Sequence, residues 1–154
     1  MTNPLENITL KDIPTVLPLL SVAEREKLLA ELEHLDKLKT RQTSQTRFLK
    51  FVTETWPSFI GGRHHARMGA AFERVANGEC KRLIINMPPR HTKSEFASYL
   101  LPAWFLGKYP HKKVIQTSHT AELAVGFGRK VRNLVDKELY TDIFPGVALQ
   151  TDSK

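Results

Sequence analysis

Apolar residues recur every three or four positions over residues 22–39, which is the spacing of one face of an α-helix. Ser21 and Glu24 stand at the two positions of a capping box at the start of this stretch. The pattern therefore predicts a charged amphipathic helix over 22–39. The polar run 40–45 that follows has no apolar periodicity, and we interpret it as a hinge.

The same spacing predicts four further helices: 48–56, about 64–77, 93–106 and 121–138. Pro57 ends the first, and Gly78 takes the C-terminal cap position of the second. Pro102 interrupts the third, because proline lacks the N–H that a helix interior needs. Thr120 caps the fourth.

Two short apolar runs, 82–87 and 114–118, carry β-branched residues and end at turn signals, which is typical of buried strands. Strand, loop, helix, strand and helix in this order form an α/β pattern in which the strands run parallel. The sequence therefore predicts an α/β fold with parallel strands, preceded by an α-helical N-terminal arm.

The net charge differs between the arm and the rest of the chain. Residues 1–40 hold five Lys or Arg and seven Asp or Glu, a net charge of −2, whereas 41–154 hold eighteen and nine, a net charge of +9. A positive body suits nucleic acid or nucleotide phosphates, although a merely solvated basic surface has the same composition. The single Cys80 excludes an internal disulfide framework. With no signal-peptide pattern and no apolar stretch of membrane-spanning length, we expect a soluble intracellular chain.

A phosphate-binding loop is predicted between the first strand and the helix that follows it. Lys93 and Ser94 open this helix directly after a tight turn, and amides at a helix N-terminus attract phosphate oxygens. The strict pattern of such loops has two glycines, and Met87 and Thr92 stand in their places. Because glycine normally permits a positive φ there, the pattern alone leaves open an ordinary helix start.

The run 82–95, with Pro-Pro-Arg-His-Thr-Lys-Ser within it, strongly resembles the variant Walker A segment of the large terminase subunits of tailed bacteriophages. In that family the loop commonly reads Pro-Pro-Arg-His before a variable residue and Lys-Ser, so the absent glycines are a habit of the family. The resemblance covers about residues 48–145 and includes, outside the loop, Trp56, Phe59, His64, His65, Gly78, Ser118, His119, Phe127, Arg129 and Arg132.

This resemblance implies an ATP-driven motor that packages viral duplex DNA into a procapsid, in the cytoplasm of a bacterial host. It implies a P-loop ATPase core of the additional-strand class, of which 46–154 form the beginning and 1–45 the helical arm and hinge. The implied cofactor is Mg-ATP. The implied partners are double-stranded DNA, the portal protein, the small terminase subunit and further copies of the full-length chain in a ring.

The match also assigns roles within the loop. The residues implied to bind nucleotide are Pro88, Pro89, Arg90, His91, Thr92, Lys93 and Ser94. Lys93 would reach the β- and γ-phosphates, and Ser94 would ligate Mg²⁺. Arg90 would stabilise charge on the γ-phosphate or, alternatively, bond local carbonyls. Lys93 and Arg90 are therefore the candidate catalytic residues.

Arg129 and Arg132 are candidates for an arginine finger that acts on the ATP of a neighbouring subunit. On a helical wheel they lie opposite the apolar stripe of the last predicted helix, so they point away from the core. The alternative is a solvated helix face on which Arg132 pairs with Asp136.

ATP hydrolysis requires an acid at the end of a further apolar strand to hold Mg²⁺, and another acid or equivalent group to orient the attacking water. We find no acid that follows an apolar strand after the run 114–118. Asp136 and Glu138 lie in a predicted helix, and Asp142 precedes the run 143–145. We therefore expect a fragment without the Walker B part and the nuclease domain of the family, which does not hydrolyse ATP by itself.

Two other functions remain open from the residues. The loop and the charge also fit another P-loop nucleic-acid-dependent NTPase such as a helicase, or a non-catalytic basic module that binds nucleic acid. Three lysines beside a loop, Lys108, Lys112 and Lys113, either contact DNA phosphates or are merely solvated. The adjacent His64 and His65 lack metal-ligand spacing, so we expect them to pack or to lie near the adenine base.

Overall fold

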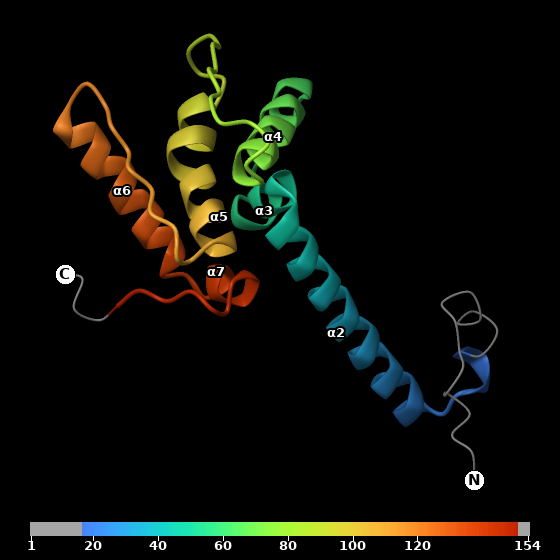
Figure 1. Ribbon diagram of the computed structural model, residues 1–154. Helices are drawn as coiled ribbons and strands as arrows, with labels where there is room; N and C mark the ends of the chain where they lie inside the picture. Colours follow the sequence, from blue (N-terminus) through green and yellow to red (C-terminus); the bar gives the residue numbers. More distant parts are fainter. Residues whose placement is uncertain (1–16, 151–154) are drawn as a thin grey trace. The chain divides into compact units, whose positions relative to one another are not determined.

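The computed structural model describes residues 17–150, apart from the side chain of Leu19, and every regular element among them is a helix (Figure 1). In chain order they are η1 (Leu17–Leu19), α2 (Val22–Thr46), α3 (Phe48–Thr55), α4 (Arg63–Ala76), η2 (Glu95–Leu100), α5 (Leu101–Lys108), α6 (Ala121–Val135) and α7 (Glu138–Ile143). The chain divides into two units, one up to Lys39 and one from Thr40 onward, and each is described by itself. Residues 1–16 of the predicted arm lie outside the described part. None of the described helices is long and apolar enough to cross a lipid bilayer.

The predicted α/β fold with parallel strands is wrong, because residues 17–150 contain no strand and no sheet. The runs 82–87 and 114–118, predicted as buried strands, have no regular secondary structure. Two of their β-branched side chains are largely exposed, Ile84 at 94% and Ile115 at 89%. The P-loop core implied by the resemblance therefore lacks its sheet within residues 17–150.

The first of these runs shows why the prediction failed. Ile85 and Met87 pack against the helical core, while Ile84 and Asn86, which alternate with them, are exposed, so the side-chain alternation of a strand is present. A β-branched apolar run favours an extended backbone, but a sheet also requires a second strand that supplies hydrogen bonds to it. The sequence pattern therefore indicated an extended backbone correctly, but it could not show whether a second strand lies beside it.

α2 begins as predicted. Ser21 N–H and Oγ donate to Glu24 Oε2 at 2.8 and 2.6 Å, and Glu24 N–H donates back to Ser21 Oγ at 3.4 Å. The capping box is thus confirmed, and the bonds from the Ser21 hydroxyl and amide lower the pKa of the Glu24 carboxyl. The helix does not end near residue 39, however, but continues to Thr46 through the polar run that we interpreted as a hinge.

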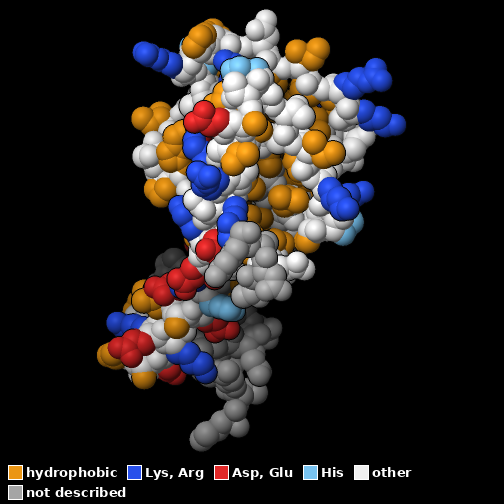
Figure 2. All heavy atoms as spheres, turned by 90° about the vertical axis from the view of Figure 1, so that its left-hand side faces the viewer, with side chains coloured by type: hydrophobic (Ala, Val, Ile, Leu, Met, Phe, Trp, Pro, Cys, Tyr) orange, Lys and Arg blue, Asp and Glu red, His pale blue; other side chains and the backbone are white. Residues whose placement is uncertain are grey.

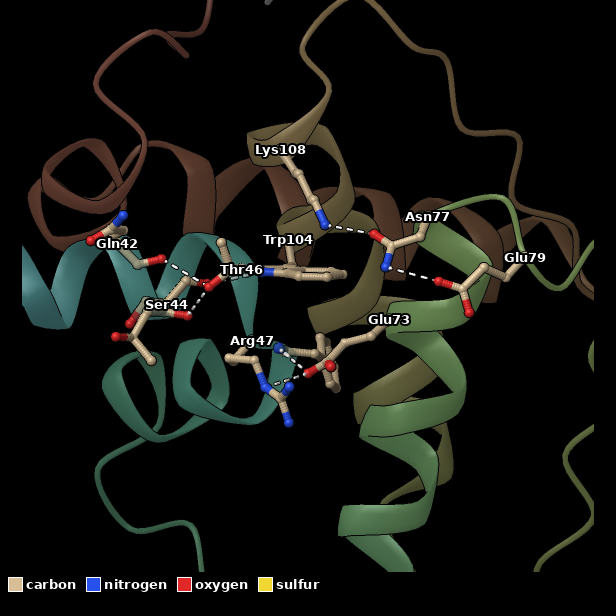
Figure 3. Close-up of polar contacts among 11 residues, drawn as sticks. Gln42, Ser44, Thr46, Arg47, Glu73, Asn77, Glu79, Trp104 and Lys108 are labelled. Atoms are coloured by element: carbon tan, nitrogen blue, oxygen red, sulfur yellow. Dashed lines mark hydrogen bonds and ion pairs between the residues drawn. The ribbon is translucent and has the colours of Figure 1, made fainter.

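The C-terminal end of α2 belongs to the second unit, where the Trp104 side chain of α5 contacts it (Figure 3). Ser44 is fully buried, and its carbonyl accepts Trp104 Nε1–H at 2.9 Å. The donor that a longer helix would offer this carbonyl is Phe48 N–H, which instead donates to Glu73 Oε1 at 3.0 Å. The polar run is therefore helical because an indole from α5 completes its last turn.

The core of the second unit is a cluster of aromatic rings around Phe48. Its ring makes edge-on contacts with Phe72, Phe96 and Trp104, at centroid distances of 5.2, 5.5 and 5.6 Å. All four side chains are at most 1% exposed. Edge-on pairs contribute about 0.5–1.5 kcal/mol each beyond the area they bury, so this cluster joins α3, α4, η2 and α5 into one body.

η2 and α5 form the middle of the second unit, with α6 on one side and α3 on the other (Figure 1). Together with Lys93 and Ser94 they make one continuous helix up to Lys108, so Pro102 does not interrupt it as predicted. In an α-helix the missing N–H of Pro102 would have donated to the carbonyl of Ser98. The chain there is π-helical, and Gln116 Nε2 donates to the Ser98 carbonyl at 3.0 Å.

Two predicted helix ends are confirmed, and one is corrected. α4 closes with Gly78 at φ +81°, where Gly78 N–H donates to the Val75 carbonyl and Glu79 N–H to that of Arg74. Thr120 caps α6 by accepting the N–H of Leu123 at 3.3 Å. α6 ends at Val135, however, three residues before the predicted end, and a separate helix, α7, begins at Glu138.

Candidate phosphate-binding loop

Residues 88–94 form a loop that leads directly into the helix of η2 and α5. Lys93 and Ser94 are the first helical residues, and Phe96 N–H donates to the carbonyl of Thr92 at 2.9 Å. The amides of the first turn have no acceptor within the helix. These amides and the positive end of the helix dipole favour an anion at this point.

Two residues of the loop, Arg90 and Thr92, have left-handed backbones, with φ of +64° and +58°. Within the described residues, they are the only non-glycine residues with a positive φ. Thr92 occupies the second glycine position of the phosphate-loop pattern, so the loop takes the conformation that glycine would permit although a β-branched residue stands there. Since a left-handed backbone costs about 1–2 kcal/mol for such a residue, other contacts of Thr92 must offset this cost.

The Thr92 hydroxyl provides these contacts. His65 Nε2 lies 2.7 Å from Thr92 Oγ1, and Thr92 Oγ1 donates to the carbonyl of His91 at 2.7 Å. Net contributions of about 0.5–1.5 kcal/mol per bond match the cost of the left-handed backbone. On the other side of the loop, His91 Nδ1 lies 2.9 Å from the Pro89 carbonyl.

His65, at the start of α4, is buried with 6% exposure. Its ring lies 4.8 Å from that of Phe59 and 4.9 Å from that of Phe96, measured between centroids. Burial lowers the pKa of His65, and charge on His64 and His91 lowers it further. The environment therefore favours the neutral imidazole.

The three side chains assigned chemical roles belong to this loop and are not engaged elsewhere. Arg90 and Ser94 are exposed, and Lys93 is half-buried. None of the three forms a hydrogen bond or an ion pair with another residue of the described segment. All three are therefore available to a ligand at the helix N-terminus.

The acid beside the loop is neutralised by a neighbouring helix. Glu95 Oε1 accepts from Lys130 Nζ of α6 at 2.8 Å. The same ammonium lies 5.8 Å from the ring centroid of Tyr99 and 5.6 Å from that of Phe127. This arrangement offsets the negative charge nearest the candidate anion site.

Arg129 and Arg132 are exposed on α6, whereas Val131 and Leu134 of the same helix are buried. The two arginines thus face away from the core, as their spacing predicts, and no contact joins them to the loop among the described residues. Arg132 forms no ion pair with Asp136 within the described segment. Their role as an arginine finger stays a prediction.

The surface of the second unit carries both charged and apolar side chains. Figure 2 shows the side that carries α6, where hydrophobic side chains are exposed and Lys and Arg gather mainly around the edge. Lys112 and Lys113 are exposed. Lys108 instead donates to Asn77 Oδ1 at 2.9 Å, and its ammonium lies 5.0 Å from the Trp104 ring centroid (Figure 3). Its charge is therefore already engaged by other residues of the second unit.

The loop itself was found from the sequence, but the residue that supports it was not. His65 drew attention only as a packed side chain or a neighbour of adenine, because nothing in the spacing links it to Thr92, 27 residues away. No protein family, no curated protein and no solved structure matches this chain.

Proposed function

We propose that residues 88–94 bind the phosphates of Mg-ATP and that the chain is a segment of an ATP-driven DNA-packaging motor of the large-terminase kind. The observation that carries the proposal is the backbone of Thr92, which is left-handed at the glycine position of the loop, directly before Lys93 and Ser94. The resemblance of run 82–95 to the terminase loop supplies the class of protein.

The geometry supports a separate task for each side chain. Lys93 extends from the first turn and brings a positive charge to the β- and γ-phosphates. Arg90, exposed on the other left-handed residue, brings a second charge to the γ-phosphate. The exposed and unengaged hydroxyl of Ser94 fits Mg²⁺, which prefers oxygen ligands and, when bound, neutralises phosphate charge.

The partners in this proposal follow from charge and from the resemblance. The net charge of +9 over residues 41–154 and the exposed Lys112 and Lys113 favour duplex DNA as a partner. The portal protein, the small terminase subunit and a ring of full-length copies are proposed on the resemblance alone. In such a ring, Arg129 and Arg132, which are exposed on α6, would be the residues that reach a neighbour's nucleotide.

The test is equilibrium binding of Mg-ATP to the whole chain by calorimetry. Lys93→Ala should abolish binding, whereas Lys113→Ala, which removes the same charge from an exposed site outside the loop, should leave the affinity within about twofold because distant surface charges are screened. Retention of the unmodified affinity in Lys93→Ala would refute the phosphate-loop assignment.

A second candidate, a basic module that binds nucleic acid without nucleotide, is favoured by the charge and by the exposed lysines. It predicts salt-dependent binding of duplex DNA that Lys93→Ala weakens only slightly, together with no Mg-ATP binding.

We also expect no steady-state phosphate release from this chain alone. Turnover that disappears in Lys93→Ala would show that a catalytic acid has been overlooked.

A further inference from the structure

We propose that His65 is a positioning residue for the phosphate loop, because its neutral imidazole holds Thr92 in the left-handed conformation that aims the first-turn amides. This inference rests on the proposed function of residues 88–94. His65 would not touch the nucleotide; it would act through the Thr92 hydroxyl.

The hydrogen bonds around His65 show which of its two ring nitrogens carries a proton. Gly62 N–H donates to His65 Nδ1 at 2.9 Å, so Nδ1 carries no proton. The Thr92 hydroxyl donates its proton to the His91 carbonyl, so its oxygen accepts from His65 Nε2–H at 2.7 Å. Only the neutral Nε2–H tautomer satisfies all three contacts.

The side chains around the His65 ring fix its orientation and favour its neutral form. Phe59 and Phe96 contact its ring, so neither the ring plane nor the bond to Thr92 is free to turn. The titratable groups beside it are His64 on the same helix and His91 in the loop, and a positive charge on either disfavours a charged His65. A doubly protonated ring would also place Nδ1–H against the N–H of Gly62.

The consequence is that a tertiary contact replaces a glycine. In a loop with glycine at position 92 the left-handed backbone needs no support. Here it is supported from α4, and Phe96, which follows the loop at the start of η2, packs on the same imidazole. Loss of the His65–Thr92 bond should therefore weaken phosphate binding although no group that touches phosphate has changed.

Two variants of His65 distinguish its hydrogen bond with Gly62 from its hydrogen bond with Thr92. His65→Asn keeps an acceptor near the Gly62 N–H but is too short to reach Thr92, whereas His65→Gln keeps a donor at the reach of Nε2. His65→Asn should weaken Mg-ATP binding by about fivefold to tenfold, the equivalent of one lost hydrogen bond, and His65→Gln should recover most of this loss. Thr92→Val removes the hydroxyl from the other side, so it should show the same loss, with little further change when combined with His65→Asn.

The decisive comparison uses Thr92→Gly as background. Glycine adopts the positive φ by itself, so His65→Asn should change the Mg-ATP affinity less than about twofold there. A merely structural role for His65 would give the same loss in both backgrounds, and that result would overturn the proposal. If the unmodified chain binds Mg-ATP, Lys93→Ala abolishes binding and His65→Asn does not weaken it, this inference fails while the proposed function stands. Nitrogen NMR of His65 in the free protein supplies a readout independent of nucleotide, and an Nδ1–H tautomer would also refute the proposal.

Discussion

Replacement of Gly107 by alanine should destabilise the second unit, because α5 lies directly against an aromatic ring at this position. A Cβ atom built on Gly107 would lie 2.4 Å from Cδ2 and 2.6 Å from Cε2 of Phe144. The Phe144 ring is 4% exposed and packs against Phe51 and Tyr140 at centroid distances of 5.9 and 5.2 Å, so it has little room to withdraw. Overpacking of this kind costs about 1–3 kcal/mol. The better helix propensity of alanine returns about 1 kcal/mol, which leaves a net loss of up to about 2 kcal/mol.

Gly128→Ala is the matched control, since Gly128 lies within α6 and a Cβ there meets nothing within 4 Å. This variant should gain about 0.5–1 kcal/mol from helix propensity alone. Urea unfolding followed by circular dichroism at the helical band measures both changes. Equal stabilisation by the two substitutions would show that Phe144 does not lie against Gly107, and the packing of residue 144 on α5 would then be wrong.

Three further predictions concern the core, the pH dependence and the arm. Trp104→Phe should cost about 2–4 kcal/mol in urea unfolding, because it leaves the buried Ser44 carbonyl without its donor and opens a gap, whereas Trp56→Phe, whose Nε1–H bonds the exposed Ser58 hydroxyl, should cost clearly less. Because burial lowers the pKa of His65 in the folded protein, its contribution to stability should be constant above the ordinary value of 6.5 and decrease as the pH falls through that value toward the lowered one; a slope unchanged by His65→Gln would contradict this. Deletion of residues 1–39 should leave Mg-ATP affinity unchanged within about twofold, since every contact that we find for the loop within the described segment involves later residues, and loss of binding on deletion would show that the arm completes the site.

Local signals in the sequence were sufficient where the structure depends on neighbouring residues. The Ser21 capping box, the Gly78 cap of α4 and the Thr120 cap of α6 each involve side chains and amides within a few positions, and all were predicted. The helix start at Lys93 was predicted for the same reason. These features follow from local propensity and need no knowledge of the fold.

The errors arose where a distant residue decides the local structure. The run 40–45 is helical because Trp104 and the Ile143 carbonyl bind Ser44 and Gln45, contacts that span 60 and 98 positions. The run 82–87 has the composition of a strand but meets helices instead of a second strand. The glycine that the loop lacks is compensated by a histidine on another helix, which no motif could reveal.

The central claim is that residues 88–94, together with the free amides of the first helical turn that follows, hold the phosphates of Mg-ATP. The most direct measurement is a titration of the ¹⁵N-labelled chain with Mg-ATP, in which backbone amide shifts are followed residue by residue. The account predicts that the largest saturable shifts fall on Thr92, Lys93, Ser94 and Glu95, and that they are absent in Lys93→Ala. Shifts that centre instead on the exposed Lys112 and Lys113, or that do not saturate, would contradict it.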